Sequence, residues 1–198
     1  MGKIGIVILA AGASRRLGEP KQLLRLSGKS LLRRTAEEAL AVDAACVIVV
    51  LGAYAEKMIP ELEGLNVLIA ENHDWQEGMA SSIRVGIGAL QKQQVNAALL
   101  MLCDQPLIGR EFLEEMMAVW RRLSVPVVAA GYGNAVGAPA LFESVLFDDL
   151  MKLRGESGAR QLIRQHPYEV LPCPAGLVDI DTPEHKMAVE AIFKLKSQ

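Results

Sequence analysis

Cysteine, histidine and aromatic residues are scarce in this chain, and their scarcity excludes several kinds of site. The 198 residues include three cysteines, three histidines and only 5% aromatic residues. The cysteines are odd in number, lie far apart, and each stands in or beside an apolar run. We therefore expect reduced, buried thiols rather than a disulfide framework or a metal cluster. The histidines show no metal-ligand spacing, and no Ser/His/Asp or Cys/His arrangement of a nucleophilic enzyme is present.

The chain also has no marked excess of charge and no long hydrophobic run. It carries 21 basic and 23 acidic residues, a net charge of −2, so nothing indicates a nucleic-acid surface or an anionic membrane as a partner. No stretch approaches the roughly 20 apolar residues of a membrane span. The start, MGKI, runs into a short apolar segment that is a poor signal peptide. We expect a cytoplasmic protein in which any bound anion is held by a local arrangement.

What the sequence does contain is a regular alternation of strand-like and helix-like segments. Over half of the residues are apolar, enough for one core, and we expect a single domain over residues 1–198. Continuous apolar runs predict buried strands, and i, i+3 and i+4 spacing predicts helices. The predicted strands are residues 4–10, 46–51, 67–70, 97–103 and 126–130. The predicted helices are residues 29–41, 79–91, a segment marked by Phe112, Met116, Trp120 and Leu123, and a C-terminal helix with Met187, Ala191, Ile192 and Leu195 on one face.

This order of elements predicts an α/β fold with a mostly parallel sheet and helices on both faces. Ligands of such folds bind outside the carboxyl ends of the strands, so we expect function just after Leu9, Ala70, Cys103 and Ala130. Residues 131–139 are rich in glycine and proline and are predicted to form a loop, the best candidate for a mobile flap.

The turn after the first predicted strand combines small residues with cations. Residues 9–14 read LAAGAS, and small side chains let the backbone N–H groups approach and cradle phosphate oxygens. Arg15 and Lys21 follow and supply cationic donors for a polyphosphate. A lone glycine turn would favour a tight strand-to-helix turn with solvated charges. The coincidence of small residues, two cations and a strand end favours a phosphate site.

Two other nucleotide motifs are not supported. Residues 27–30, SGKS, contain the end of a P-loop, but the position five residues before its glycine is Leu23, so we predict a turn and a helix start. A dinucleotide site needs G-x-G-x-x-G and an acid at the end of the second strand. The loop has only Gly12 and Gly18, and residues 51–53 (LGA) contain no acid, so NAD binding is not expected.

Two aspartates are candidate metal ligands. Asp104 follows the apolar strand 97–103, where a carboxylate costs desolvation unless it is paired or holds a cation. Mg²⁺ is usually held by one or two carboxylates together with phosphate oxygens and water. Asp104 is therefore predicted to bind Mg²⁺. Asp181, in the segment VDIDTP, fits a second ligand and a helix N-cap equally well, and Asp179 is expected to be structural.

Taken together, these segments resemble the molybdenum cofactor cytidylyltransferases, within the wider class of nucleotidyltransferases with a Rossmann-like sheet. The resemblance covers nearly the whole chain and rests on six segments in the family's order: residues 9–24, 71–87, 103–108, 137–142, 154–163 and 178–185. It implies a Rossmann-like three-layer nucleotidyltransferase fold. The implied reaction is Mg²⁺-dependent transfer of CMP from CTP to molybdopterin, with release of pyrophosphate. An acceptor phosphate is ionised near neutral pH, so no catalytic histidine or cysteine is needed.

The resemblance also implies roles for single residues. Those implied to be catalytic are Arg15, Lys21 and Asp104. Those implied to bind the nucleotide are Ala10, Ala11, Gly12, Arg15, Lys21, Gly78 and Ser82, of which the alanine pair faces the base in the cytidylyl branch. Gly155, Ser157 and Arg160 match a segment bordering the acceptor, and Asp104 and Asp181 match the metal ligands. The plainer interpretation of Ser81 and Ser82 is an ordinary first turn of a helix, and Trp75 is expected to pack in the core.

The chain departs from the family's pattern on the acceptor side. Glu156 stands where the family usually has aspartate, Ala138 where histidine or asparagine often precedes proline, and residues 132–135 lack the basic residues frequent there. Three hypotheses therefore remain. The first is cytidylyl transfer to molybdopterin, with a molybdenum hydroxylase of the xanthine dehydrogenase type as a possible client. The second is guanylyl or sugar-phosphate nucleotidyl transfer. The third is a non-catalytic molybdenum cofactor chaperone, against which the intact glycine loop and Asp104 weigh.

Overall fold

The computed structural model describes residues 2–14, 17–156, 158–177, 180, 185, 187, 189, 191 and 193. Within this part, a seven-stranded sheet runs through the molecule in the order β5-β4-β1-β6-β8-β7-β9. Its strands are β1 (Ile4–Leu9), β4 (Cys46–Leu51), β5 (Leu68–Glu71), β6 (Ala97–Leu102), β7 (Val127–Tyr132), β8 (Ala135–Glu143) and β9 (Tyr168–Pro172). Neighbouring strands pair in parallel, except that β8 is antiparallel to both β6 and β7. The predicted mostly parallel sheet is thus confirmed.

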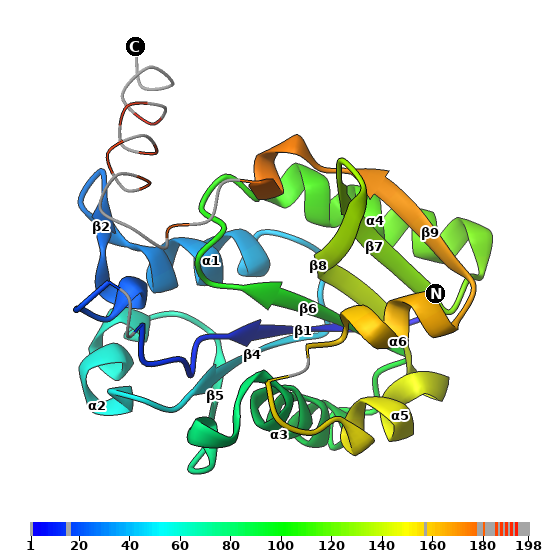
Figure 1. Cartoon of the computed structure of the whole chain (residues 1–198), viewed down its shortest axis with the longest axis horizontal. Helices are drawn as coiled ribbons and strands as arrows, with labels where there is room; N and C mark the ends of the chain where they lie inside the picture. Colours follow the sequence, from blue (N-terminus) through cyan, green and yellow to red (C-terminus); the bar gives the residue numbers. More distant parts are fainter. Residues whose placement is uncertain are drawn as a thin grey trace.

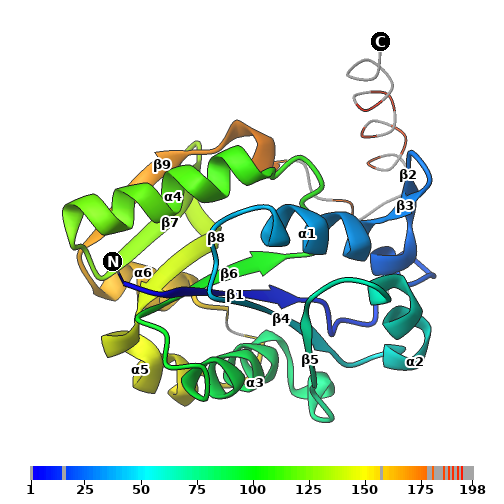
Figure 2. The same cartoon turned by 180° about the vertical axis from the view of Figure 1, so that it is seen from behind.

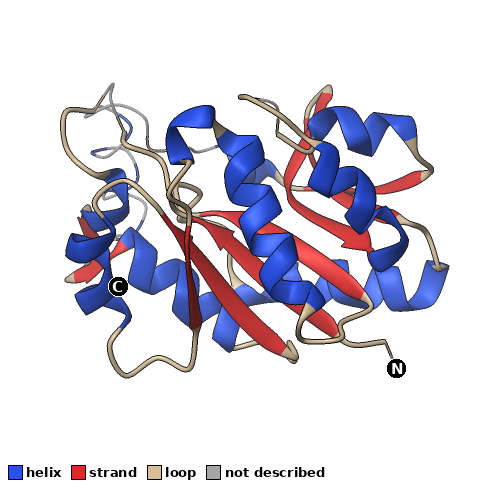
Figure 3. Cartoon of the chain, turned by 90° about the horizontal axis from the view of Figure 1, so that it is seen from below, coloured by secondary structure: helices blue, strands red, loops and turns tan. Residues whose placement is uncertain are grey.

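Helices cover both faces of this sheet (Figures 1 and 2). Helices α1 (Leu31–Leu40) and α4 (Arg110–Leu123) lie on one face, and α3 (Met79–Gln91), α5 (Phe147–Lys152) and α6 (Arg160–Gln165) on the other. Figure 3 shows helices packed over the strands as seen from below. The remaining elements are α2 (Ala55–Met58), the short hairpin β2 (Arg25–Leu26) and β3 (Lys29–Ser30), and the 3₁₀ turns η1 (Lys21–Leu23), η2 (Ile59–Leu62), η3 (Trp75–Glu77), η4 (Ser144–Leu146) and η5 (Pro174–Leu177).

The strands are apolar throughout because both of their faces are buried. In β1, Ile6 and Ile8 join the cluster that contains α1 and α4, whereas Val7 joins the cluster of α3 and α5. Both sets are inaccessible to solvent. This explains why the predicted strands show continuous runs and no alternation of apolar and polar residues.

Most predicted elements agree with the structure to within about two residues at their ends. Helix α3 has the predicted bounds, and the helix predicted from residue 29 begins instead at Leu31. Ser27 and Gly28 form the turn of the β2–β3 hairpin, with φ of 50° and 83°, and the Ser30 side chain then caps α1 by accepting a bond from Arg33 N. The predicted turn and helix start in place of a P-loop is therefore confirmed.

The predicted loop over residues 131–139 is wrong. These residues finish β7, turn at Gly133 and begin β8, so most of the segment is a hairpin of paired strands. Within it, β8 pairs with β7 alone, because β6 pairs only with residues 140–143 of β8. The predicted C-terminal helix is helical at its described positions. Met187 is 62% exposed and Val189 is buried, so the predicted apolar face is not the packed one. Ile192 and Leu195 lie outside the described residues.

The order of the strands places a topological switch at β1. From β1 the chain adds β4 and β5 on one side, then returns to add β6 on the other side. The loops after β1 and β6 therefore open a crevice at their carboxyl ends, where open α/β sheets bind ligands. No helix in the described part of the chain has the length and apolarity needed to cross a membrane.

Candidate active site

A cavity of about 320 Å³ lies at the carboxyl ends of β1 and β6. We call it the first cavity. The ends of the two strands form its floor, the glycine loop one wall, and the segment leading into α3 the other wall. Its lining residues are Leu9, Ala11, Gly12, Ala13, Lys21, Gln22, Trp75, Gln76, Gly78, Met79, Ser82, Leu102, Cys103, Asp104 and Glu156.

The shape of the glycine loop is held by Gln22, which the sequence analysis did not single out. The Gln22 side-chain amide donates to Ala10 O at 2.9 Å and to Gly12 O at 2.7 Å, and the residue is only 2% exposed. Ser14 completes the loop, because its hydroxyl accepts from Lys21 N at 3.0 Å and donates to Gln22 Oε1 at 3.3 Å. These bonds satisfy carbonyl groups that a turn would otherwise bury without partners. The only sequence signal was a polar amide amid the apolar residues of PKQLL.

Within the loop, Ala11 and Gly12 face the first cavity and Ala10 does not. Ala10 is buried in the cluster on the α1 side, and its N–H donates to Val50 O at 3.0 Å. A side chain at Gly12 would meet nothing within 4 Å, so open space adjoins its backbone. This open space is compatible with a ligand's phosphate groups beside Gly12, which stays a prediction.

Lys21 and Asp104 form an ion pair across the first cavity. The Lys21 ammonium contacts Asp104 Oδ2, and the two side chains are 22% and 14% exposed. Asp104 Oδ1 is buried and has no hydrogen-bond partner among the described residues. Ile180 N donates to Asp104 O at 3.1 Å, which brings the chain just before Asp181 beside Asp104. Asp181 itself, like Arg15 and Ser157, lies outside the described residues.

The donor set around Asp104 fits a divalent cation that shares its ligands with a phosphorylated substrate. The described residues contain no cluster of three His, Cys, Asp or Glu side chains that would hold a metal by themselves. The unpartnered Oδ1 of Asp104 is a free oxygen of the type that Mg²⁺ or Mn²⁺ takes, with substrate oxygens and water completing the shell. Burial, and then the neighbouring Asp104 charge, raises the pKa of the Cys103 thiol, so this group is protonated at neutral pH.

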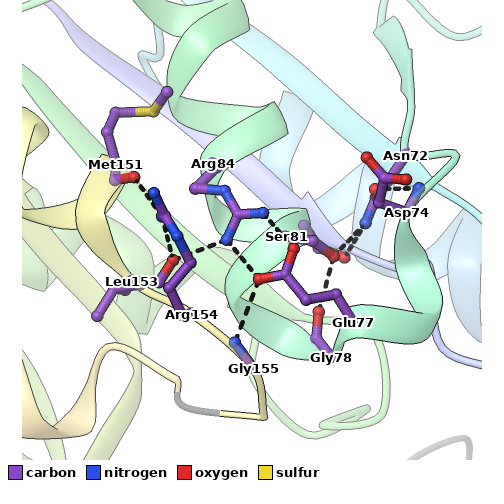
Figure 4. A network of polar contacts seen from close by, with 11 residues as sticks. Asn72, Asp74, Glu77, Gly78, Ser81, Arg84, Met151, Leu153, Arg154 and Gly155 are labelled. Carbon is purple, nitrogen blue, oxygen red and sulfur yellow. Dashed lines mark hydrogen bonds and ion pairs between the residues drawn. The ribbon is translucent and has the colours of Figure 1, made fainter.

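Buried polar contacts hold the start of α3, which forms the opposite wall of the first cavity. Asn72 donates from its amide to Ser81 Oγ at 2.8 Å and to Ser82 Oγ at 2.9 Å, and all three residues are buried (Figure 4). Ser82 lies in the first turn of α3 and also lines the cavity. Asn72, one residue beyond β5, was not predicted.

Trp75 both packs and lines the first cavity. It lies against the apolar cluster on the α3 side, as the sequence predicts. Its Cβ would be 2.7 Å from a Cβ at Gly52, so only glycine there admits this packing. The exposed part of Trp75 borders the cavity beside Gln76 and Gly78.

A second cavity of about 300 Å³ adjoins the first and shares Leu9, Met79, Leu102 and Glu156 with it. Its other lining residues are mostly apolar: Ile83, Leu100, Gly137, Ala138, Ala140, Phe142, Gly158, Ala159, Arg160 and Ile163. The Arg160 guanidinium lies over Gly137, where its Nη2 would be 3.5 Å from an added Cβ. No ion pair joins Arg160 to another residue of the described ranges, which leaves its charge available to an anion.

The structure therefore gathers most of the predicted site residues into two groups. Ala11, Gly12, Lys21, Gly78, Ser82 and Asp104 surround the first cavity. Arg160 lies at the second cavity, together with Glu156 and Ala138, the two single residues at which the chain departs from the family's pattern. Ala10 and Gly155 line neither cavity.

Comparison with known proteins agrees with this arrangement. The sequence profile of the MobA-like NTP transferase domain matches residues 6–170. The chain is 32% identical to nicotine blue oxidoreductase of Paenarthrobacter nicotinovorans, over 96% of this chain and 94% of that protein. It is 24% identical to a molybdenum cofactor guanylyltransferase of Shewanella sp. (strain ANA-3), over 96% of each chain.

A solved structure adds a metal to the comparison. Rv0371C of Mycobacterium tuberculosis H37Rv, in complex with manganese, superposes with a TM-score of 0.77 and 26% identity, covering 96% of this chain and 98% of that one. The family profile, which matches residues 6–170, spans every residue that lines either cavity. From its sequence and its fold, the chain belongs to the family of MobA-like NTP transferase domains.

Proposed function

We propose that this protein transfers CMP from CTP to molybdopterin and releases pyrophosphate. The observation that carries the proposal is the pair of adjoining cavities at the switch point of the sheet. The first has a phosphate-accommodating loop, a lysine and a carboxylate, and the second is apolar with one arginine. A triphosphate fits the first set and a ring system bearing a phosphate fits the second.

The chemistry asks for positioning and charge neutralisation more than for covalent catalysis. An oxygen of the acceptor phosphate attacks the α-phosphorus of CTP, the bond from the α-phosphorus to the bridging oxygen breaks, and pyrophosphate leaves. Lys21, and Arg15 by family resemblance, neutralise charge on the triphosphate and the leaving group. Ala11 and Gly12 both line the first cavity. The proposal places the phosphates against the backbone of Gly12 and the base beside Ala11.

Asp104 would hold the divalent cation, with Asp181 as the proposed second ligand. Bound there, Mg²⁺ supplies positive charge that offsets charge on the phosphate oxygens. The unpartnered Asp104 Oδ1 supports this role, and so does the manganese complex of the related mycobacterial protein.

For the acceptor, Arg160 is proposed to bind the phosphate of molybdopterin, with Gly155 and Ser157 in the adjoining segment. The wall formed by Leu100, Phe142 and Ile163 suits a flat ring system. Ala138 and Glu156 replace residues frequent in the family, and both line this cavity. A guanylyl or sugar-phosphate transferase, and a chaperone that only holds the cofactor for a molybdenum hydroxylase, are the alternatives that an assay must separate.

The name of the Paenarthrobacter relative describes a redox activity. A nicotinamide dinucleotide would require a tighter glycine pattern and an acid at the end of the second parallel strand. Here β4 ends at Leu51, followed by Gly52 and Ala53, and the loop after β1 has only Gly12 and Gly18. These features favour a triphosphate over a dinucleotide.

The test is the identity of the product. The purified protein is incubated with Mg²⁺, molybdopterin and an equimolar mixture of the four NTPs, and the products are resolved by mass spectrometry. We expect molybdopterin enlarged by CMP and an equal amount of pyrophosphate. A GMP adduct would favour the guanylyl alternative. Retention of molybdopterin with no adduct would favour the chaperone, and neither binding nor adduct would reject the proposal.

A further inference from the structure

We propose that Glu77 and Arg84 are positioning residues for the transfer reaction. Together with the backbone of Leu153 and Gly155 they form a clasp that fixes the partition between the two cavities. This inference rests on the proposed function, because it concerns how nucleotide and acceptor are kept in register. It adds two residues to which neither the sequence analysis nor the family resemblance gave a role.

The clasp consists of four hydrogen bonds from three parts of the chain (Figure 4). Arg84, on α3, donates from Nη1 to Glu77 Oε1 at 2.8 Å and from Nη2 to Glu77 Oε2 at 2.5 Å. The same Nη1 donates to Leu153 O at 2.7 Å, and Gly155 N donates to Glu77 Oε1 at 3.2 Å. The loop that follows α5 is thereby tied to the turn that begins α3.

Backbone packing beneath the clasp brings the two segments into direct contact. Ala80 N donates to Gly155 O at 3.1 Å. Gly78 has φ of +118°, and a Cβ there would stand 2.6 Å from Gly155 O. Only glycine lets the two backbones approach so closely, so the requirement at Gly78 comes from the loop beside it as well as from the first cavity.

The clasp matters because of where it lies, next to residues that line both cavities, and not because of its charge. Met79 and Glu156 each follow a residue of this contact directly in the chain, and both line the first and the second cavity. The Arg84 and Glu77 side chains are 19% and 33% exposed, and ion pairs of this kind contribute little to overall stability. A bidentate Arg–carboxylate contact does fix the relative orientation of the two segments, and here it determines the positions of Met79 and Glu156.

The carboxylate of the clasp stays ionised over the whole neutral range. The hydrogen bonds from Arg84, and then the one from Gly155 N, lower the pKa of Glu77 to about 2. Lysine in place of Arg84 keeps the charge but cannot reach both carboxylate oxygens and Leu153 O at once. Arg84→Lys therefore tests the geometry separately from the charge.

Arg33→Lys is a matched control. Arg33 also pairs with a glutamate, Glu37, and also donates to backbone carbonyls, those of Glu61 and Glu63, but it lines neither cavity. We expect Arg84→Lys to speed hydrogen–deuterium exchange in residues 153–158 by about tenfold, and Arg33→Lys to leave that segment unchanged. Unchanged exchange in Arg84→Lys would overturn the clasp.

The kinetic measurement uses CTP and molybdopterin as the two substrates. For Arg84→Lys we expect KM for molybdopterin to rise about fivefold or more, KM for CTP to stay within about twofold, and Tm to fall no further than in Arg33→Lys. Glu77→Gln keeps an oxygen for Gly155 N and should show a smaller rise. Equal changes in both KM values, or none, would overturn the positioning role. If the wild type forms no adduct at all, the proposed function fails, and the exchange measurement alone decides the clasp.

Discussion

At the scale of single residues, the ion pair between Lys21 and Asp104 links the glycine loop to the end of β6. In Asp104→Asn the side chain keeps its shape but loses the charge that we assign to cation binding. We expect kcat to fall at least about 100-fold, the size typical of losing one electrostatic group from an active site. Circular dichroism should show an intact fold. Turnover equal to that of the wild type would remove Asp104 from the site.

We assign Lys21 to nucleotide binding rather than to the stability of the fold. Lys21→Ala should weaken CTP binding or turnover at least about tenfold, equivalent to about 1.4 kcal/mol, a modest demand for a charge-assisted phosphate contact. Lys29→Ala is the control, because Lys29 also pairs with a carboxylate, Glu37, and neither residue lines either cavity. Calorimetric titration with CTP measures both. Equal affinity in the two variants would reduce Lys21 to a partner of Asp104 alone.

Gln22 supports the loop without a charge. In Gln22→Leu the carbonyls of Ala10 and Gly12 lose their donor, and leaving the buried Ala10 carbonyl unsatisfied costs about 1–3 kcal/mol. We expect Tm to fall by at least about 2 °C, given about 2–4 °C per kcal/mol for a chain of this size. CTP affinity should fall with it. The exposed Gln93 changed to leucine should leave both quantities unchanged, and an unchanged Tm in Gln22→Leu would show that the loop holds its shape without this side chain.

At the scale of elements, two glycines of the α3 region should respond oppositely to alanine. Gly78 has φ of +118° and no room for a Cβ, so Gly78→Ala should cost about 1–3 kcal/mol and lower Tm by about 3–9 °C. Gly88 lies within α3, and a Cβ there meets nothing within 4 Å. Gly88→Ala should therefore raise Tm by about 1–4 °C, since alanine is the better helix former. Differential scanning calorimetry compares them, and a fall of the same size in both would contradict the contact between Gly78 and Gly155.

The elements that could be predicted from the sequence are those in which a single pattern of apolar residues, either a continuous run or helical spacing, is present. The apolar runs of β1, β4 and β6 and the helical spacing of α3 have no competing signal. Strand β8 was missed because it contains Gly137 and Pro139, which normally interrupt a strand. The register of β7 and β8 shifts between Ala129 and Ala130, so Ala138 and Pro139 fall in an irregularity outside the regular ladder. That irregularity depends on pairing with a distant strand, and local sequence does not reveal it.

The residues of the candidate site likewise fall into those that local sequence indicates and those that only the folded chain reveals. Gly12 and Asp104 follow the ends of β1 and β6, and Lys21 follows the glycine loop. Local patterns indicate all three residues, and all three line the first cavity. Asn72, Gln22 and the Glu77–Arg84 pair act through contacts that only the folded chain supplies. Arg84 reaches Leu153 O, 69 positions further along the chain. A single sequence contains no information on that proximity, whereas the family resemblance drew attention to Gly78 and Gly155 separately.

At the scale of the whole molecule, two adjoining cavities lie at one end of the sheet. The carboxyl ends of β1 and β6 hold the first cavity, and the antiparallel β8 turns its Gly137–Ala140 stretch toward the second. The nucleotide side agrees with the family's pattern, whereas the departures Ala138 and Glu156 lie on the acceptor side. Substitutions at Ala138 or Glu156 are therefore expected to alter KM for the acceptor more than KM for the nucleotide.

The central claim is CMP transfer from CTP, and its most direct test is kcat/KM for CTP and for GTP with molybdopterin as the common acceptor. Ala11 lines the first cavity. In the proposed complex its methyl group would narrow the slot beside the base, and a difference of that size is worth about 1–3 kcal/mol, or about 10- to 200-fold. We predict that pyrophosphate release favours CTP by a factor in that range and that Ala11→Gly reduces the factor. Equal values for the two nucleotides, or a preference for GTP, would contradict the account.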